Sequence, residues 1–257
     1  MEDLDHDREV PGAADRILRT LDAFGFQWRG AVLRQSQRTA YYEAAVESLQ
    51  AAGRVFRCTC TRAGLSGLPR TPGGEAIYPG TCRGGDVPLD VAASLRFHTG
   101  PAGRTIRVTD ALQGPLAQDV AVEVGDFVIR RRDGVHAYQL AVVVDDAAQQ
   151  VTEVVRGCDL LDNTPRQVLL QQALSLPTPG YAHLPLLLEP DGTKLSKRAR
   201  AVPLAAAKAP EMLHMALHLL GQRPPADLRR ADVRSLWAWA MENWDPSPLR
   251  GLRVIRL

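Results

Sequence analysis

The spacing of apolar residues divides the chain into helices and strands. Apolar positions that recur every three to four residues predict helices, bounded by glycine or proline, over 12–25, 39–52 and 163–174. Short apolar runs predict strands at 55–58, 95–98, 106–108, 127–130, 152–156 and 184–188. After residue 199 the chain is rich in alanine and leucine, and we expect it to be helical. Strands that alternate with helices predict an α/β fold.

The run 140–144 is apolar at every position, so periodicity alone leaves two interpretations open. It fits a buried parallel strand, and it also fits a piece of buried helix. We place it as a strand that follows Tyr138 and ends at Asp145 and Asp146.

Length and composition limit the class of protein. At 257 residues and 45% hydrophobic, the chain can bury a substantial core, as one large or two smaller domains. Its formal charge of +2, from 31 basic and 29 acidic residues, gives no warrant for nucleic-acid binding over the whole surface, so any such surface must be local. No apolar run is long enough to span a bilayer, and residues 1–5 lack the features of a signal peptide. Four cysteines are too few for a disulfide framework, so we expect a cytoplasmic protein with reduced thiols.

Three cysteines and a tyrosine converge on one loop that is rich in glycine and proline. Cys58 and Cys60 form a Cys-x-Cys pair, Tyr78 and Cys82 follow, and the stretch 64–85 holds too few apolar residues to fold around itself. Zinc bound by thiolates would cross-link such a loop. Three unrelated buried cysteines are the alternative, because no fourth cysteine or histidine lies nearby in the sequence.

Polar side chains stand where strands are predicted to begin or end. Arg156 closes one strand, Tyr138 precedes another, and Glu2 and Asp3 are acidic residues near what would be a third strand end. Ligands of open α/β sheets collect at the carboxyl ends of strands, where an arginine can bind a carboxylate with two hydrogen bonds. An acidic residue there is suited to receive an amino group. The alternative for each residue is an ordinary surface position or a helix cap.

The polar loop 191–198 carries two lysines on either side of a serine, namely Lys194, Ser196 and Lys197. Ammonium groups on a loop of this kind can stabilise the negative charge of a triphosphate. A solvated basic turn is the alternative interpretation.

Five segments that occur in order resemble the catalytic domain of class I glutamyl-tRNA synthetases. They are MEDLD with Arg8 and PGA (1–13), QSQR (35–38), YQLAVVVDD (138–146), VRGCDL (155–160) and KLSK (194–197). The resemblance covers most of the chain up to about residue 200. Since the sequence stops near residue 257, we expect the helical anticodon-binding half of those enzymes to be absent, and with its Cys-x-Cys…Tyr-x-x-x-Cys pattern the chain is similar to the short members of that family that modify tRNA(Asp).

The resemblance implies a Rossmann-type class I catalytic domain with a zinc-bearing insertion and a helical C-terminal segment. The implied divisions are a first catalytic part (1–57), the insertion (58–124), a second catalytic part with the KMSKS-like loop (125–198), and the helical segment (199–257).

The resemblance also implies a reaction in two steps. L-glutamate and ATP, with Mg²⁺, would give glutamyl-adenylate, and the glutamyl group would pass to the cyclopentene diol of queuosine in the anticodon stem-loop of tRNA(Asp). Glutamate would be held by Glu2, Tyr138 and Arg156. ATP would be contacted by Lys194, Ser196 and Lys197, of which the two lysines would be catalytic. One structural zinc ion would be held by Cys58, Cys60, Tyr78 and Cys82. The protein would be a cytoplasmic monomer with no membrane partner.

One part of the family pattern has no counterpart in the chain. The family opens with a strand and a histidine-containing ATP motif, whereas Met1 already stands where the family has its second strand, and His6 follows that position. Either the start codon is placed too late or the catalytic domain is N-terminally incomplete. If the chain as given is the whole molecule, we expect it to be poorly folded or inactive in adenylation. Two other functions stay open: a truncated glutamyl-tRNA synthetase that charges the tRNA 3′ end, and a catalytically silent, zinc-stabilised tRNA-binding module.

Overall fold

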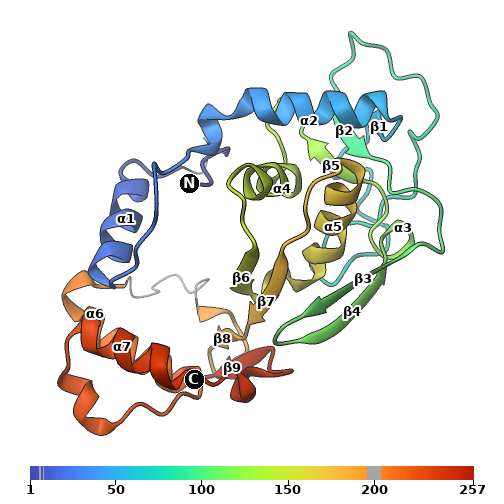
Figure 1. Ribbon diagram of the computed structural model, residues 1–257. Helices are drawn as coiled ribbons and strands as arrows, with labels where there is room; N and C mark the ends of the chain where they lie inside the picture. Colours follow the sequence, from blue (N-terminus) through green and yellow to red (C-terminus); the bar gives the residue numbers. More distant parts are fainter. Residues whose placement is uncertain (6, 8, 196–203) are drawn as a thin grey trace.

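The computed structural model describes residues 1–5, 7, 9–195 and 204–257, whose arrangement is drawn in Figure 1. The helices of this part of the chain are α1 (Ala13–Ala23), α2 (Thr39–Ala51), α3 (Val120–Glu123), α4 (Tyr138–Ala148), α5 (Thr164–Ala173), α6 (Ala209–Leu219) and α7 (Val233–Asn243). The strands are β1 (Val55–Cys58), β2 (Ser94–Phe97), β3 (Thr105–Asp110), β4 (Gly114–Asp119), β5 (Phe127–Arg130), β6 (Glu153–Gly157), β7 (Gly180–Leu184), β8 (Leu186–Leu188) and β9 (Val254–Arg256). Helices and strands alternate, which confirms the predicted α/β class.

The described strands form three sheets. In the first, β1, β2 and β5 pair antiparallel in that order. The second has the order β4-β3-β7-β6, in which β3 and β4 form an antiparallel pair and β3, β7 and β6 run parallel. The third is the parallel pair β8 and β9. Strand pairing thus joins the segment 58–124 to the segment that follows it, since β2 pairs with β5 and β3 with β7.

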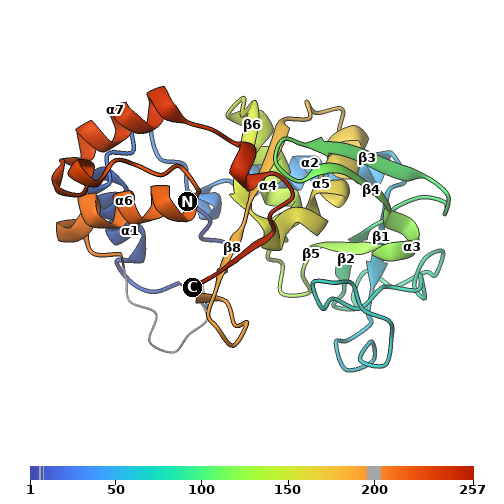
Figure 2. The ribbon, with the colours of Figure 1, turned by 90° about the horizontal axis from the view of Figure 1, so that it is seen from below.

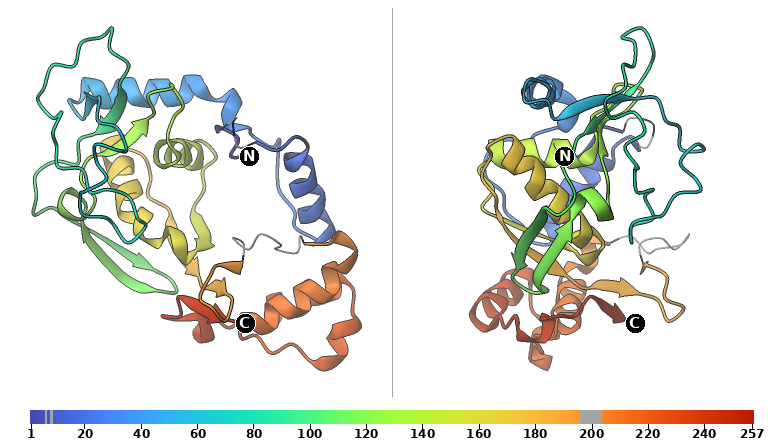
Figure 3. Two further views of the ribbon diagram at one scale, coloured as in Figure 1. Left: turned by 180° about the vertical axis from the view of Figure 1, so that it is seen from behind. Right: turned by 90° about the vertical axis from the view of Figure 1, so that its right-hand side faces the viewer.

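The main hydrophobic core lies between the first two sheets and helices α2, α4 and α5. Its fully buried side chains include Tyr42, Leu49, Phe97, Ile129, Leu140 and Leu170. A smaller core joins α6 to α7 through Leu213, Leu217, Leu236 and Ala240. Helix α7 also contacts the end of α1, where Trp237 Nε1 donates a hydrogen bond to the carbonyl of Phe24 at 2.7 Å. Figures 2 and 3 show α1, α6 and α7 grouped on one side and the first two sheets on the other.

The apolar run 140–144 lies in helix α4, so the prediction of a strand there is wrong. Helix α4 packs against α2, α5 and β5, and even its polar residues Gln139 and Asp145 are buried. A helix enclosed by neighbours on most sides needs no wide polar face, so its sequence loses the 3.6-residue alternation that marks a surface helix.

The chain after residue 199 is not helical throughout, because β9 lies near its end and pairs with β8. The apolar stretch predicted at 184–188 is divided between the end of β7 and the whole of β8. These strands are defined by a partner distant in the sequence, for example Leu186 opposite Val254, and a local pattern does not contain that information. None of the described helices is both long and apolar enough to cross a membrane.

Candidate active site and metal centre

Hydrogen bonds on both sides of Glu2 fix the N-terminal segment. The backbone N–H of Gln35 donates to the carbonyl of Met1 at 3.0 Å. Asp3 accepts hydrogen bonds from the backbone N–H and the hydroxyl of Ser36, at 2.9 and 2.8 Å. Burial opposes ionisation of Asp3, but the bonds from Ser36 lower its pKa. Asp3 therefore anchors the segment, and Glu2 is left to face a cavity.

Glu2, Tyr138 and Arg156 line one cavity of about 480 Å³, a size typical of small-molecule sites. Tyr138 is the first residue of α4, and Arg156 lies near the carboxyl end of β6. The remaining lining residues are Val142, Asp146, Val154, Val155 and Leu160. The structure thus brings the three predicted glutamate-binding residues together, although Tyr138 begins a helix and not a strand.

Two carboxylates share this cavity with one guanidinium group. Burial raises the pKa of Glu2, and Arg156 opposes that rise. Burial also raises the pKa of Asp146 to about 6 and raises the pKa of Tyr138. An ammonium group on a ligand would complement the carboxylates, and a carboxylate on the same ligand would complement Arg156.

Sequence reasoning missed Asp146 as a lining residue of this cavity. Tyr138, Val142 and Asp146 are spaced by four residues, which places neighbouring members of the set on one face of a helix. In a strand, residues four apart share a face but lie about 13 Å from each other, whereas in a helix they are one turn apart, so the signal is visible only once the run 140–144 is read as helical.

The guanidinium of Arg156 is held by neighbours from three other elements, namely β7, α5 and the short 3-10 helix Cys158–Asn163. Its Nε donates to His183 Nε2 at 3.0 Å, and its Nη2 donates to Thr164 Oγ1 at 2.9 Å and to the carbonyl of Leu160 at 3.3 Å. Thr164 begins α5, and His183 lies on β7 directly opposite Arg156 in the sheet register. These contacts fix the orientation of a cation at the cavity wall. Sequence reasoning missed His183, which lies in a strand that was not predicted.

Lys194 belongs to the described part of the predicted ATP loop. Its ammonium lies 2.9 Å from Asp159 Oδ2, and its backbone forms a bridge to Leu188 at the end of β8. Asp159 follows β6 by two residues, so this ion pair connects the loop to the strand that carries Arg156. Ser196 and Lys197 lie outside the described residues.

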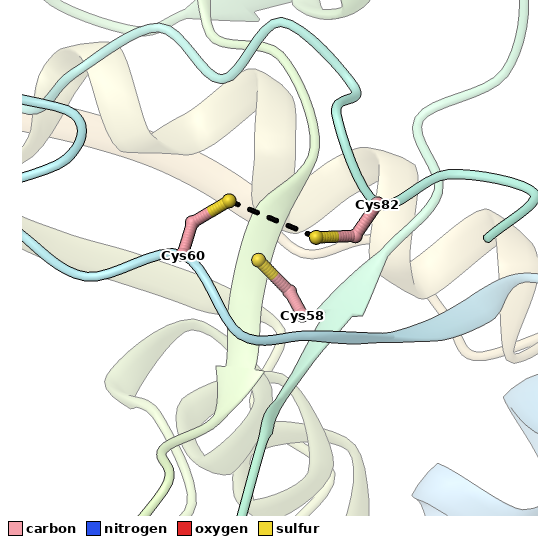
Figure 4. A group of neighbouring side chains, drawn as sticks. All are labelled: Cys58, Cys60 and Cys82. Atoms are coloured by element: carbon pink, nitrogen blue, oxygen red, sulfur yellow. Dashed lines mark hydrogen bonds between the residues drawn. The ribbon is translucent and has the colours of Figure 1, made fainter. Parts of the chain in front are cut away.

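Cys58, Cys60 and Cys82 point toward one another, as Figure 4 shows, and their sulfurs all lie within 4.8 Å of one another. The Sγ atoms of Cys60 and Cys82 are 3.7 Å apart, close to the separation of about 3.8 Å for two sulfurs on a tetrahedral zinc ion at 2.3 Å. The hydroxyl of Tyr78 lies 3.5 Å from Cys58 Sγ and 3.8 Å from Cys60 Sγ. Three thiols and a phenol oxygen thus form a compact four-donor set, and its chemistry fits a zinc ion.

Neighbouring residues set the orientation of the cysteine side chains and shift their pKa values. The hydrogen bond from Tyr78 lowers the pKa of Cys82 to about 6, whereas burial raises the pKa of Cys60 and of Tyr78. Arg96 donates from Nε to Cys58 Sγ at 3.2 Å, and its guanidinium lies 3.9 Å from the centre of the Tyr78 ring. A buried cation therefore accompanies the thiols.

Comparison with known proteins places the chain in a family. The family model of class I tRNA synthetases (E and Q), catalytic domain, matches residues 1–74 and 87–227. A protein of Pseudomonas aeruginosa named glutamyl-Q tRNA(Asp) synthetase is 50% identical over 246 residues, which are 95% of this chain and 80% of that protein. A protein of the same name from Thiobacillus denitrificans is 51% identical over 245 residues, with the same coverage.

Solved structures show the same fold. The glutamate tRNA ligase of Elizabethkingia meningosepticum, crystallised with its amino acid, superposes with a TM-score of 0.75 at 22% identity. That match covers 100% of this chain, which spans 59% of the length of the ligase. Since the family model covers most of the chain and the relatives are about half identical, the chain belongs to the family of class I tRNA synthetases (E and Q) by its catalytic domain.

Proposed function

We propose that the protein is a cytoplasmic, tRNA-modifying ligase that activates L-glutamate with ATP and transfers the glutamyl group to queuosine in tRNA(Asp). The observation that carries this proposal is the cavity in which Arg156 faces Glu2, Tyr138 and Asp146. Its charges complement a free amino acid that has an ammonium group and carboxylates. The names of relatives at about half identity support glutamate as the amino acid and tRNA(Asp) as the acceptor.

In the proposed first step, the cavity positions glutamate for attack on ATP. Arg156 binds a substrate carboxylate, Glu2 and Asp146 receive the ammonium, and Tyr138 offers its hydroxyl to either group. A carboxylate oxygen of glutamate attacks the α-phosphorus of ATP, and pyrophosphate leaves. Lys194 and Lys197, with Ser196 between them, contact the phosphates, whose growing charge two ammonium groups stabilise. Mg²⁺ accompanies ATP as its usual counter-ion.

In the proposed second step, a hydroxyl oxygen of the queuosine diol attacks the activated carbonyl carbon, and AMP leaves. The step needs no protein nucleophile, so this chain contributes by positioning the reactants and stabilising charge. Zinc bound by Cys58, Cys60, Tyr78 and Cys82 would supply a cross-link that holds the loop between β1 and β2 in place.

Label transfer tests the proposal and separates it from the other two functions. The purified chain is incubated with radiolabelled glutamate, ATP and Mg²⁺, and with tRNA(Asp) that either contains or lacks queuosine. We expect label on the wobble nucleoside of the queuosine-containing tRNA alone after nuclease digestion. Label on the terminal adenosine would instead identify a synthetase that charges the 3′ end.

Glutamate-dependent exchange between ATP and pyrophosphate, measured in parallel, tests the activation step by itself. Binding of tRNA(Asp) without exchange or transfer would contradict the proposal and identify a silent binding module. Exchange by the chain would also refute the expectation that it is inactive in adenylation.

A further inference from the structure

Three neighbouring strands bring a carboxylate, an imidazole and the guanidinium of the cavity within hydrogen-bonding distance of one another in succession, carboxylate to imidazole and imidazole to guanidinium. In the sheet order β3-β7-β6, Asp110 ends β3, His183 lies on β7, and Arg156 lies on β6 directly opposite His183. His183 Nδ1 lies 2.6 Å from Asp110 Oδ2, and His183 Nε2 lies 3.0 Å from Arg156 Nε. Residues that are far apart in the sequence thus form a continuous chain of hydrogen bonds that ends at the cavity.

The hydrogen bonds determine which imidazole nitrogen carries the proton. The Nε of arginine is always a donor, so His183 Nε2 must be the acceptor. The proton of the neutral ring therefore sits on Nδ1, which donates to the Asp110 carboxylate. Burial lowers the pKa of His183, the hydrogen bond to Asp110 opposes that shift and the charge of Arg156 reinforces it, which agrees with a ring that accepts at Nε2.

Asp110 is itself fixed in place. Its Oδ1 accepts hydrogen bonds from the backbone N–H groups of Leu112, Gln113 and His183, which leaves Oδ2 for the imidazole. Asp110 and His183 are both almost wholly buried, at 3% and 0% exposed. The other groups against the imidazole are the Thr164 hydroxyl at 3.4 Å from Nε2, the backbone carbonyl of Leu160, which also receives Arg156 Nη2, and the Tyr181 ring, stacked at 6.3 Å between centroids. Among the described residues around it, Asp110 and Arg156 are thus the charged side chains that contact His183.

We propose that Asp110 and His183 form a positioning pair: Asp110 selects the imidazole tautomer, and His183 uses that tautomer to aim Arg156 at the substrate carboxylate. Neither residue needs to touch the substrate. Since Arg156 is the proposed glutamate-binding cation, the consequence for affinity rests on the proposed function, whereas the orientation of Arg156 does not.

The substitution Asp110→Asn tests the tautomer with little change of shape. The amide side chain of this variant would keep an oxygen for the three backbone N–H groups and present its N–H₂ to His183 Nδ1. Nδ1 would then have to accept, the ring proton would move to Nε2, and two donors, Nε2–H and Arg156 Nε–H, would face each other. We expect nitrogen NMR of the wild-type protein to show His183 protonated on Nδ1 and a slowly exchanging Arg156 Nε–H.

In Asp110→Asn we expect the His183 proton on Nε2 and an Arg156 Nε–H that exchanges at least about tenfold faster, because its acceptor is lost. His183→Gln and His183→Leu form a second pair if the Asp110→Asn variant does not fold. The glutamine oxygen can stand near the position of Nε2 and should protect Arg156 in part, whereas leucine should not. Tyr181→Phe, which keeps the stacked ring, is the matched control and should leave both signals unchanged.

Glutamate affinity, measured by calorimetry on the same variants, gives the functional consequence. We expect Asp110→Asn and His183→Leu to weaken binding about tenfold or more, which corresponds to about 1.4 kcal/mol, with Tyr181→Phe close to wild type. Wild-type His183 protonated on Nε2, or an Arg156 signal that is indifferent to both substitutions, would overturn the positioning pair. If the wild-type chain binds no glutamate, the proposed function fails, and the NMR results alone decide whether the pair exists.

Discussion

At the scale of single residues, Arg96 is a buried cation beside the cysteine cluster. It contacts Cys58 Sγ, the face of the Tyr78 ring and the carbonyl of Asp126. Three thiolates around one Zn²⁺ carry a net negative charge, which a cation at 3.2 Å offsets strongly in a buried setting. We therefore predict that Arg96→Leu weakens zinc affinity about 10- to 100-fold, the usual effect of losing a partner of a metal ligand. Competition with a chromophoric chelator measures this affinity without any need for enzyme activity.

Two further variants separate charge from hydrogen bonding at this position. Arg96→Gln keeps a donor for the Cys58 sulfur but removes the charge, so an intermediate affinity is expected. Arg57→Leu makes the same change of charge on β1, where Arg57 donates to the backbone carbonyls of Pro88, Leu89 and Val91. Equal losses in Arg96→Leu and Arg57→Leu would show that Arg96 has no specific effect on the metal centre.

At the scale of elements, the backbone of the turn between α3 and β5 packs directly against the backbone of the metal-binding loop at Tyr78. Gly125 in this turn has φ of +72°, and a Cβ on it would lie 2.4 Å from the Tyr78 carbonyl oxygen and 2.8 Å from the Tyr78 nitrogen. Two penalties therefore act on Gly125→Ala, namely a left-handed backbone and a clash with backbone atoms. We predict a loss of free energy of unfolding of more than about 2 kcal/mol in denaturant melts, together with weaker zinc binding because Tyr78 is displaced.

Gly53→Ala is the matched control for this prediction. Gly53 also has a positive φ, +65°, but no atom lies within 4 Å of a Cβ built on it. Its substitution should cost only the conformational penalty of about 1 kcal/mol and leave zinc affinity unchanged. Similar melts for the two variants would mean that the contact between the turn and Tyr78 relaxes without cost.

The packing of each element, and the distance in sequence to its partners, determine whether the sequence predicts it. Helices α1, α2 and α5 have apolar stripes or clear boundaries, and their predicted ranges agree with the structure to within about two residues. Helix α4 is predicted as a strand because it is enclosed on most sides and has no apolar stripe. Strands β7 and β9 are not predicted because their pairing partners lie far along the chain. The cavity residues Glu2, Tyr138 and Arg156 are candidates from their places at predicted strand ends, and the family resemblance supplies their role, whereas Asp146 and His183 require the helix register and the sheet pairing.

At the scale of the whole molecule, the N-terminal segment, α4 and β6 meet to enclose two carboxylates that the protein's own cations balance only in part. Asp146 has a pKa of about 6 in the folded protein, against 3.8 for an ordinary aspartate, mainly because of burial. Between these two values the folded state binds more protons than the unfolded state. The contribution of Asp146 to the free energy of unfolding must therefore fall as the pH rises from about 4 to about 6, and burial of Glu2 acts in the same direction.

Removal of this charge should stabilise the protein and impair the site. We predict that Asp146→Asn raises the free energy of unfolding at pH 7.5 by about 1 kcal/mol, a figure that allows for solvent screening at this partly buried position. At about pH 2.5, well below both pKa values, Asp146 is protonated in both states, so the variant and the wild type should have equal stability. Glutamate affinity at pH 7.5 should fall, since the ammonium loses one of its two carboxylate partners.

Glu153→Gln distinguishes this effect from a general change of net charge. Glu153 is exposed on the same strand as Arg156, so its substitution should change stability by less than about 0.5 kcal/mol at either pH. Denaturant melts at the two pH values, with calorimetry at pH 7.5, provide all the measurements. If the site costs the protein stability, one and the same substitution should raise the free energy of unfolding and lower the affinity for glutamate. An Asp146→Asn variant with unchanged stability and unchanged affinity would show that Asp146 takes no part in binding.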